Sequence, residues 1–136
     1  MSEAEPAVST SEATTRGVRV EVDSRYVPER SRPDEGKWFF SYRVRISNSG
    51  DARVRLVSRH WIIEDAHGRE EEVRGPGVVG EQPVLDPGAS FEYTSFCPLE
   101  TPFGSMRGSY QMVGADGKTF DAEIAPFALA EPHSIH

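Results

Sequence analysis

The sequence lacks several features that would point to a particular class of protein. It has one cysteine, Cys97, so neither an internal disulfide nor a cysteine-based zinc site can form. Its apolar runs are only a few residues long, as at Trp61–Ile63, whereas a membrane-spanning helix needs roughly 20. Positive charge is in deficit, with 15 Lys and Arg against 22 Asp and Glu, which disfavours nucleic acid as a partner. We therefore expect no membrane insertion and no nucleic-acid binding.

Signals for processing, catalysis and metal binding are also missing. The first 16 residues have neither the basic start nor the apolar stretch of a secretory signal, so we expect a cytoplasmic protein. No G-x-S-x-G motif occurs, and no cysteine–histidine pair has an orienting partner. His133 and His136 form an H-x-x-H pair without a third ligand. The sequence thus predicts no catalytic residue, no metal site and no cofactor, and it predicts Cys97 to be a small core residue.

Alternation of apolar and polar residues is the dominant pattern that is present. It begins at Val18 and is clearest from Phe40 to Ser47, where four apolar residues alternate with polar ones. Residues 1–16 are polar and without period, so we expect a disordered tail there. The foldable domain is predicted over residues 17–130, followed by a short tail at residues 131–136.

The spacing of turns predicts the fold class. Seven to eight short strands are separated by glycine, proline and asparagine signals about every ten residues, which favours an all-β antiparallel sandwich. Two patterns point to an immunoglobulin-like or fibronectin type III-like sandwich: a turn feeding a strand at Leu85–Tyr93, and Tyr110 two residues before an apolar Met112.

A glycine-rich segment, Gly75–Gly80, matches the G-x-G-x-x-G pattern of dinucleotide-binding loops. That pattern works only where a helix follows, and Pro83 and Pro87 exclude a helix here. Pro76 also removes an amide donor. Two interpretations remain: a tight connection between strands, or a recognition loop for an anion or, through exposed valines, for a protein partner. The candidate binding residues are Gly75, Gly77, Val78, Val79, Gly80 and Gln82.

Four arginines form a second candidate surface. If the strands on either side of residues 48–51 form a hairpin, Arg45 lies beside Arg55, with Arg43 and Arg53 nearby. Salt bridges to Glu21 and Asp23 on a neighbouring strand would compensate this charge. The alternative is a basic face that docks an acidic partner or a phosphate-bearing ligand.

A set of motifs resembles the ApaG family. It runs through Gly75–Pro83, Leu85–Gly88, Phe91–Ser95, Leu99–Thr101 and Gly104–Met112, with Arg59–Trp61 and Pro33–Glu35 in support. The likeness spans about residues 17–130. The resemblance implies a fibronectin type III-like sandwich of bacterial origin and an association with cobalt resistance and magnesium efflux. Related domains in an F-box protein and in a polymerase-interacting protein imply a binding role.

The expected function is therefore a non-enzymatic interaction module with an unidentified protein partner. The alternative is a small-ligand sensor that binds a phosphorylated metabolite or pyrophosphate at the glycine-rich loop. A weak homodimer through an edge strand such as Glu70–Arg74 is left open, although its three consecutive glutamates argue against it.

Overall fold

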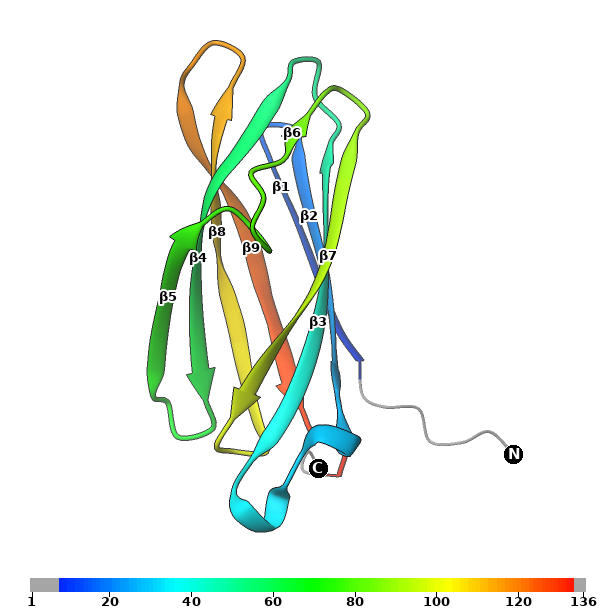
Figure 1. Ribbon diagram of the computed structural model, residues 1–136, viewed down its shortest axis with the longest axis vertical. Coiled ribbons are helices and arrows are strands. Elements are labelled where there is room, and N and C mark those ends of the chain that lie inside the picture. The colour runs from blue at the N-terminus through cyan, green and yellow to red at the C-terminus, as the bar shows by residue number, and fades with distance from the viewer. Residues whose placement is uncertain (1–7, 134–136) are drawn as a thin grey trace, which may run out of the picture.

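The computed structural model describes residues 8–133, which form nine strands in two antiparallel sheets (Figure 1). The first sheet has the order β1-β2-β3-β7 and the second the order β5-β4-β8-β9, with β6 paired to the end of β4. The first sheet comprises β1 (Val8–Thr15), β2 (Val18–Tyr26), β3 (Trp38–Asn48) and β7 (Ser90–Leu99). The second comprises β4 (Val54–Asp65), β5 (Glu70–Pro76), β6 (Val84–Leu85), β8 (Phe103–Gly114) and β9 (Thr119–Ala130). The all-β sandwich predicted from the sequence is confirmed.

Alternation in the sequence determines which side chains form the core. In β3 the side chains of Phe40, Tyr42, Val44 and Ile46 are all buried, while Arg43 and Arg45 between them face solvent. The same period places Tyr110 and Met112 of β8 inside, facing the first sheet. Two short 3-10 turns, Pro28–Arg30 and Pro33–Glu35, join β2 to β3. No helix in the described part of the chain is long and apolar enough to cross a membrane.

The prediction of a disordered tail over residues 1–16 is wrong for β1. This strand pairs with β2 along its whole length, from Val8 opposite Arg25 to Thr15 opposite Val18. Its hydroxyl side chains face β9 and bond to the β9 backbone: Ser9 Oγ accepts from Ala128 N (2.8 Å), and Ser11 Oγ donates to the Ala125 carbonyl (2.8 Å). The segment lacks apolar alternation because hydroxyl groups, not apolar side chains, make its inward contacts. Residues 1–7 and 134–136 of the predicted tails lie outside the described residues.

The expected hairpin between residues 43–46 and 53–56 does not form. Strand β3 pairs with β2 and β7, whereas β4 pairs with β5, β6 and β8, so the turn after Asn48 carries the chain from one sheet to the other. Asn48 holds this crossing, since its buried side-chain amide donates to the carbonyls of Ala52 (2.8 Å) and Leu85 (3.0 Å). Local alternation does not distinguish a hairpin from a change of sheet, because both leave a turn between two alternating runs.

The two sides of the sandwich are closed in different ways. On one side β1 and β9 are bridged by the hydroxyl contacts described above, to which Thr15 adds a bond from Glu123 N (3.1 Å). On the other side the edge strands β5 and β7 have no strand between them over the described residues. The chain from Gly77 to Pro83 covers only the upper part of this open side (Figure 1). Below it, side chains of both sheets line a pocket.

Candidate functional site

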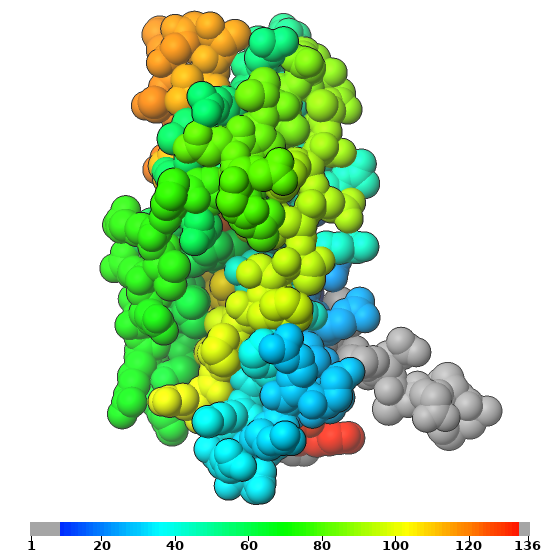
Figure 2. All heavy atoms as spheres, viewed as in Figure 1, coloured from blue at the N-terminus to red at the C-terminus, as the bar shows by residue number. Residues whose placement is uncertain are grey.

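The open side of the sandwich carries a groove between β5 and β7, which we call the seam groove. Figure 2 shows the hollow between the green surface of β5 and the yellow-green surface of β7, below the atoms of the Gly77–Pro83 loop. Its volume is about 320 Å³. Side chains from both sheets line it: Tyr42, Arg59, Trp61, Ile63, Glu71, Val73, Ser95, Phe96, Cys97, Pro98 and Met106.

Aromatic side chains form the floor of the seam groove. Tyr42 from the first sheet meets Trp61 from the second edge-on, with ring centroids 5.3 Å apart. Deeper in the core, the hydroxyls of Tyr93 and Tyr110 share a hydrogen bond of 2.5 Å that links the two sheets. Burial raises the pKa of both hydroxyls, so they stay neutral. The hydroxyl of Tyr110 thus joins the two sheets inside the sandwich.

Arg59 is an arginine on the inner side of its strand. It precedes buried Trp61 by two residues and pairs with buried Tyr110 on β8 and with Gly75 on β5. Its guanidinium lies over Gly75: a Cβ at that glycine would be only 2.9 Å from Arg59 Nη2. Arg59 Nη1 donates to the carbonyls of Pro76 (3.0 Å) and Gly77 (2.9 Å). Arg59 therefore fastens the glycine-rich loop to the upper end of the seam groove.

The loop Gly77–Pro83 covers the upper end of the seam groove (Figure 2), and we call it the plug. The prediction that Val78 is exposed is wrong. Val78 is 1 % exposed and belongs to the core. Three of the loop amides are engaged: Gly77 N donates to the carbonyl of Val57 (2.8 Å), and Val78 and Glu81 bond each other through both backbone groups. Gln82 adds a side-chain bond to the same Val57 carbonyl (2.9 Å). These bonds take up donors that a phosphate would need, and Pro76 and Pro83 have none.

Val79 is the exposed member of the valine pair. It is 58 % exposed, with a φ of +43°, and Gly80 follows at +82°. Positive φ at both central residues of a two-residue hairpin is the signature of a type I′ turn, which strongly prefers Asn-Gly or Gly-Gly. A β-branched residue is an outlier in this conformation. The turn consequently holds an apolar side chain in solvent at the upper end of the seam groove.

Cys97 lies in the wall of the seam groove, and its thiol is free within residues 8–133. Burial, together with the charge of Glu71, raises its pKa to about 12. The thiolate needed for nucleophilic attack is therefore not populated near neutral pH. The prediction that Cys97 is a core residue is confirmed by its 4 % exposure.

Carboxylates gather where the seam groove continues toward the lower end of β5. An adjoining depression of about 500 Å³ shares Ile63, Glu71 and Pro98 with the groove. We call it the acidic end, because four carboxylates line it against two cations. Its charged residues are Asp65, Glu70, Glu71 and Glu100, with Lys37 and Arg69. Within residues 8–133, the side chains of Glu71 and Glu100 make no hydrogen bond or ion pair.

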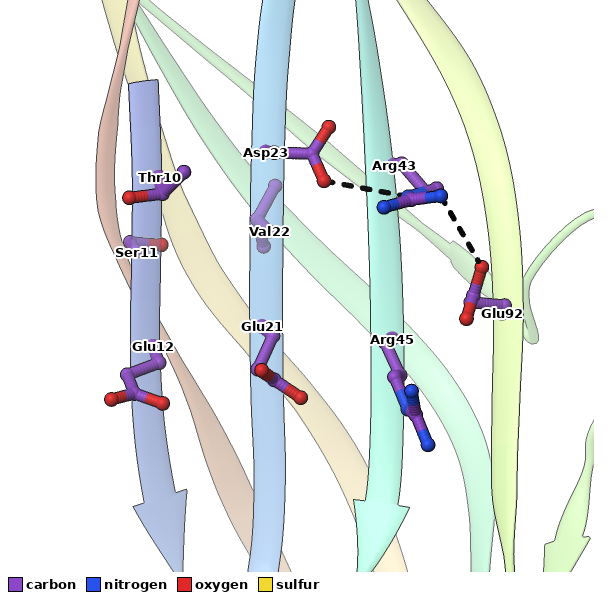
Figure 3. Close-up of a pocket in the computed structure, with 9 residues that line it drawn as sticks. All are labelled: Thr10, Ser11, Glu12, Glu21, Val22, Asp23, Arg43, Arg45 and Glu92. Atoms are coloured by element: carbon purple, nitrogen blue, oxygen red, sulfur yellow. Dashed lines mark ion pairs between the residues drawn. The ribbon is translucent and has the colours of Figure 1, made fainter. Parts of the chain in front are cut away.

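The four arginines of the second predicted surface do not share a face. Arg43 and Arg45 lie on the outer face of the first sheet (Figure 3), where Arg43 contacts Asp23 (3.4 Å) and Glu92 (3.9 Å). Arg55 lies at the start of β4 in the second sheet, and Arg53 directly precedes that strand. Arg53 contacts Asp86 (2.6 Å), and Arg55 contacts Gln82 (2.7 Å). The expected compensation by Asp23 is confirmed for Arg43. Glu21 instead contacts Arg19 (3.5 Å), so the surface is one of mixed charge and not a basic stripe.

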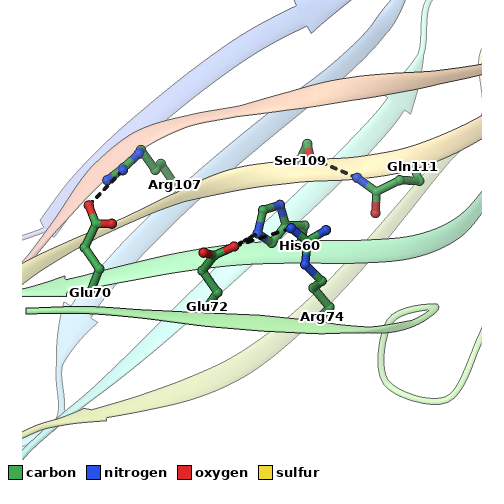
Figure 4. Close-up of polar contacts among 7 residues, drawn as sticks. All are labelled: His60, Glu70, Glu72, Arg74, Arg107, Ser109 and Gln111. Atoms are coloured by element: carbon green, nitrogen blue, oxygen red, sulfur yellow. Dashed lines mark hydrogen bonds and ion pairs between the residues drawn. The ribbon is translucent and has the colours of Figure 1, made fainter.

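The outer face of the second sheet carries a further polar cluster (Figure 4). Glu72 accepts from His60 Nε2 (2.7 Å) and lies 3.4 Å from Arg74, while Glu70 contacts Arg107 (3.0 Å). The hydrogen bond with His60 lowers the pKa of Glu72. These side chains are solvated strand neighbours, and no group of three or more His, Cys, Asp or Glu in the described part of the chain could hold a metal ion. His136 lies outside that part.

Sequence reasoning missed the residues that shape the seam groove. Tyr42, Trp61 and Met106 have the pattern of ordinary core positions, because nothing local shows that an edge of the sandwich is open above them. Arg59 could have been noticed, since it stands two residues from Trp61 in an inward-facing run. A bulge between Leu56 and Ser58 shifts the alternation just before it and conceals the inward direction.

Comparisons with known proteins place the chain among described relatives. A family model for the ApaG domain matches residues 28–114. Protein ApaG of Anaeromyxobacter dehalogenans strain 2CP-C is 60 % identical over 93 % of this chain and 99 % of its own, and Protein ApaG of Pseudomonas paraeruginosa is 54 % identical over 90 % and 98 %. A crystal structure of a Bordetella pertussis protein described as ApaA superimposes with a TM-score of 0.84 at 53 % identity, covering 86 % of this chain and 95 % of that one. The chain therefore belongs to the ApaG family.

Proposed function

We propose that this protein is a non-catalytic, cytoplasmic binding module that docks a protein partner along the seam groove. The observation that carries the proposal is the groove itself: a pocket of about 320 Å³ lies between the unpaired edges of β5 and β7, over the side chains of Tyr42 and Trp61. The association with cobalt resistance and magnesium efflux, implied by the family resemblance, would then operate through the partner.

The Val79 turn supports the same assignment. An αL conformation costs a non-glycine residue roughly 1–2 kcal/mol, and here the side chain stays 58 % exposed. Local strain that stability does not explain is a common property of binding surfaces. The loop behind Val79 is rigidly fixed by Arg59, Gln82 and buried Val78, so the turn would meet a partner without the entropic cost of ordering a mobile loop.

Affinity capture from the native host, followed by mass spectrometry, tests the proposal. The bait is the full chain, compared with Val79→Asp and Val73→Lys, which alter the turn and the groove wall. Val84→Asp is the matched control, because Val84 is 52 % exposed on β6 but does not line the groove. We expect one partner to be recovered by the wild type and the control and to be lost with the other two variants. Equal recovery by all four folded proteins would contradict the proposal.

A further inference from the structure

The structure also indicates what part of a partner would occupy the seam groove. We propose that the groove binds an extended peptide segment that directs an apolar side chain to the aromatic floor and a lysine or arginine to Glu71 and Glu100. This inference rests on the proposed function and specifies its ligand.

The backbone of both walls suits an extended segment. Strand β5 pairs only with β4, and β7 pairs only with β3, so over the described residues each keeps one unpaired edge on the groove. An extended peptide can add to such an edge through main-chain hydrogen bonds, with specificity supplied by pockets for alternate side chains. The plug at Gly77–Pro83 closes the upper end, which limits the segment to the lower part of the seam.

The floor offers a place for one apolar side chain. Tyr42 and Trp61 form its base and are 7 % and 3 % exposed, while the half-buried Val73 offers apolar surface at its wall. Phe96 lies at the β7 rim and is 48 % exposed. Because side chains alternate along an extended chain, a residue that points to this floor has neighbours that point back to solvent. A bound segment therefore needs an apolar residue at one position and accepts many residue types at the next.

Charge determines the rest of the ligand and argues against a second copy of the chain. Glu71 faces inward beside Cys97, and its negative charge contributes to the raised pKa of that thiol. Neither Glu71 nor Glu100 has a cation bound to its side chain within residues 8–133. Pairing of two β5 strands would bring Glu70, Glu71 and Glu72 close to their counterparts, which is unfavourable. A basic peptide meets the same carboxylates with the opposite sign.

Titration with synthetic peptides tests the inference. The probe is an acetylated, amidated nonapeptide in which threonine alternates with leucine at the centre and lysine toward one end; its comparison peptide has glutamate in place of lysine. Amide shifts of the ¹⁵N-labelled full chain are followed at Val73, Ser95 and Cys97. We expect the lysine peptide to bind at least about ten-fold more tightly than the glutamate peptide, which corresponds to about 1.4 kcal/mol, with shifts confined to β5 and β7 and with binding weakened by salt.

Charge reversal in the protein provides the second arm. Glu71→Lys combined with Glu100→Lys should reverse the preference between the two peptides. Glu123→Lys, at an exposed position of β9, should leave it unchanged. Shifts on an outer sheet face, equal affinity for both peptides, or no response to millimolar lysine peptide would overturn the inference. If capture from the host depends on Val73 and Val79 while the lysine peptide fails, the ligand chemistry is wrong and the binding function stands.

Discussion

Val79 combines an unfavourable backbone conformation with an exposed apolar side chain, and both properties follow from its place in a two-residue turn. The bonds between Val78 and Glu81 impose positive φ on the two residues between them. Gly80 adopts this conformation without strain, but Val79 does not. If the position were selected for stability alone, asparagine would be expected there, since Asn-Gly is the preferred pair in a type I′ turn.

Val79→Asn should therefore stabilise the protein while it weakens partner binding. Relief of the αL strain is expected to raise the free energy of unfolding by about 1 kcal/mol. Urea denaturation followed by circular dichroism measures this change, and partner capture measures the loss of the apolar contact. Val84→Asn serves as control, because Val84 lies in β6 and has a negative φ. A variant that is less stable than the wild type would show that Val79 is held by contacts beyond the turn.

The thiol of Cys97 should make stability depend on alkaline pH. Its folded pKa is about 12, against an ordinary value of 9.0, so the neutral thiol is favoured by folding. The contribution is complete below about pH 9, where both states are protonated, and is lost between about pH 9 and 12, as the unfolded thiol ionises first. The difference in unfolding free energy between the wild type and Cys97→Ala should fall over that range. A difference that is constant up to pH 11 would contradict the burial of the thiol.

Residues differ in how much of their role is visible in the sequence. Phe40, Tyr42, Val44 and Ile46 were correctly predicted as one buried face, because strict alternation leaves no other arrangement. Val78 was wrongly predicted to be exposed, since a glycine-rich context indicates a turn but not the direction in which the turn folds. The seam groove was not predicted because an open edge is a property of the sheet arrangement and not of any one segment.

At the scale of elements, β1 shows how a strand can form without an apolar face. Its inward positions hold Ser9, Ser11, Ala13 and Thr15, and three hydroxyls of this set bond to the backbone of β9. These contacts satisfy polar groups at the edge of the second sheet, which would otherwise face solvent or another chain. Strand β9 carries the matching edge, and its inward side chains Ala122, Ile124, Phe127 and Leu129 are buried.

Removal of residues 1–15 should accordingly destabilise the fold. Loss of three side chain–backbone hydrogen bonds, at about 1 kcal/mol each, predicts a decrease of about 2–3 kcal/mol in the free energy of unfolding. The shortened chain should also self-associate, because the edges of β2 and β9 become accessible. Urea denaturation and light scattering provide the two readouts. Removal of residues 1–7, which leaves β1 in place, is the matched control, and equal stability of the two truncated chains would refute a structural role for β1.

At the scale of the whole molecule, β1 and β9 are bridged on one side of the sandwich while the other side is open, and we expect charge to disfavour self-pairing at the open side. The formal net charge is −7, and three consecutive glutamates lie on the exposed edge strand β5. Glu71 points toward the seam, which is a known way to prevent the pairing of exposed edges. A charge that would disfavour self-association would also select a basic partner.

Replacement of Glu71 by leucine tests whether the charge of this residue keeps two copies of the chain from pairing through β5. Glu71→Leu would extend the apolar strip of Ile63 and Val73 to the free edge, so we expect concentration-dependent dimers of the variant and monomers of the wild type in sedimentation velocity. Glu123→Leu makes the same change at an exposed position of β9 and should leave the protein monomeric. A monomeric Glu71→Leu protein would mean that the shape of the seam, and not its charge, keeps copies apart.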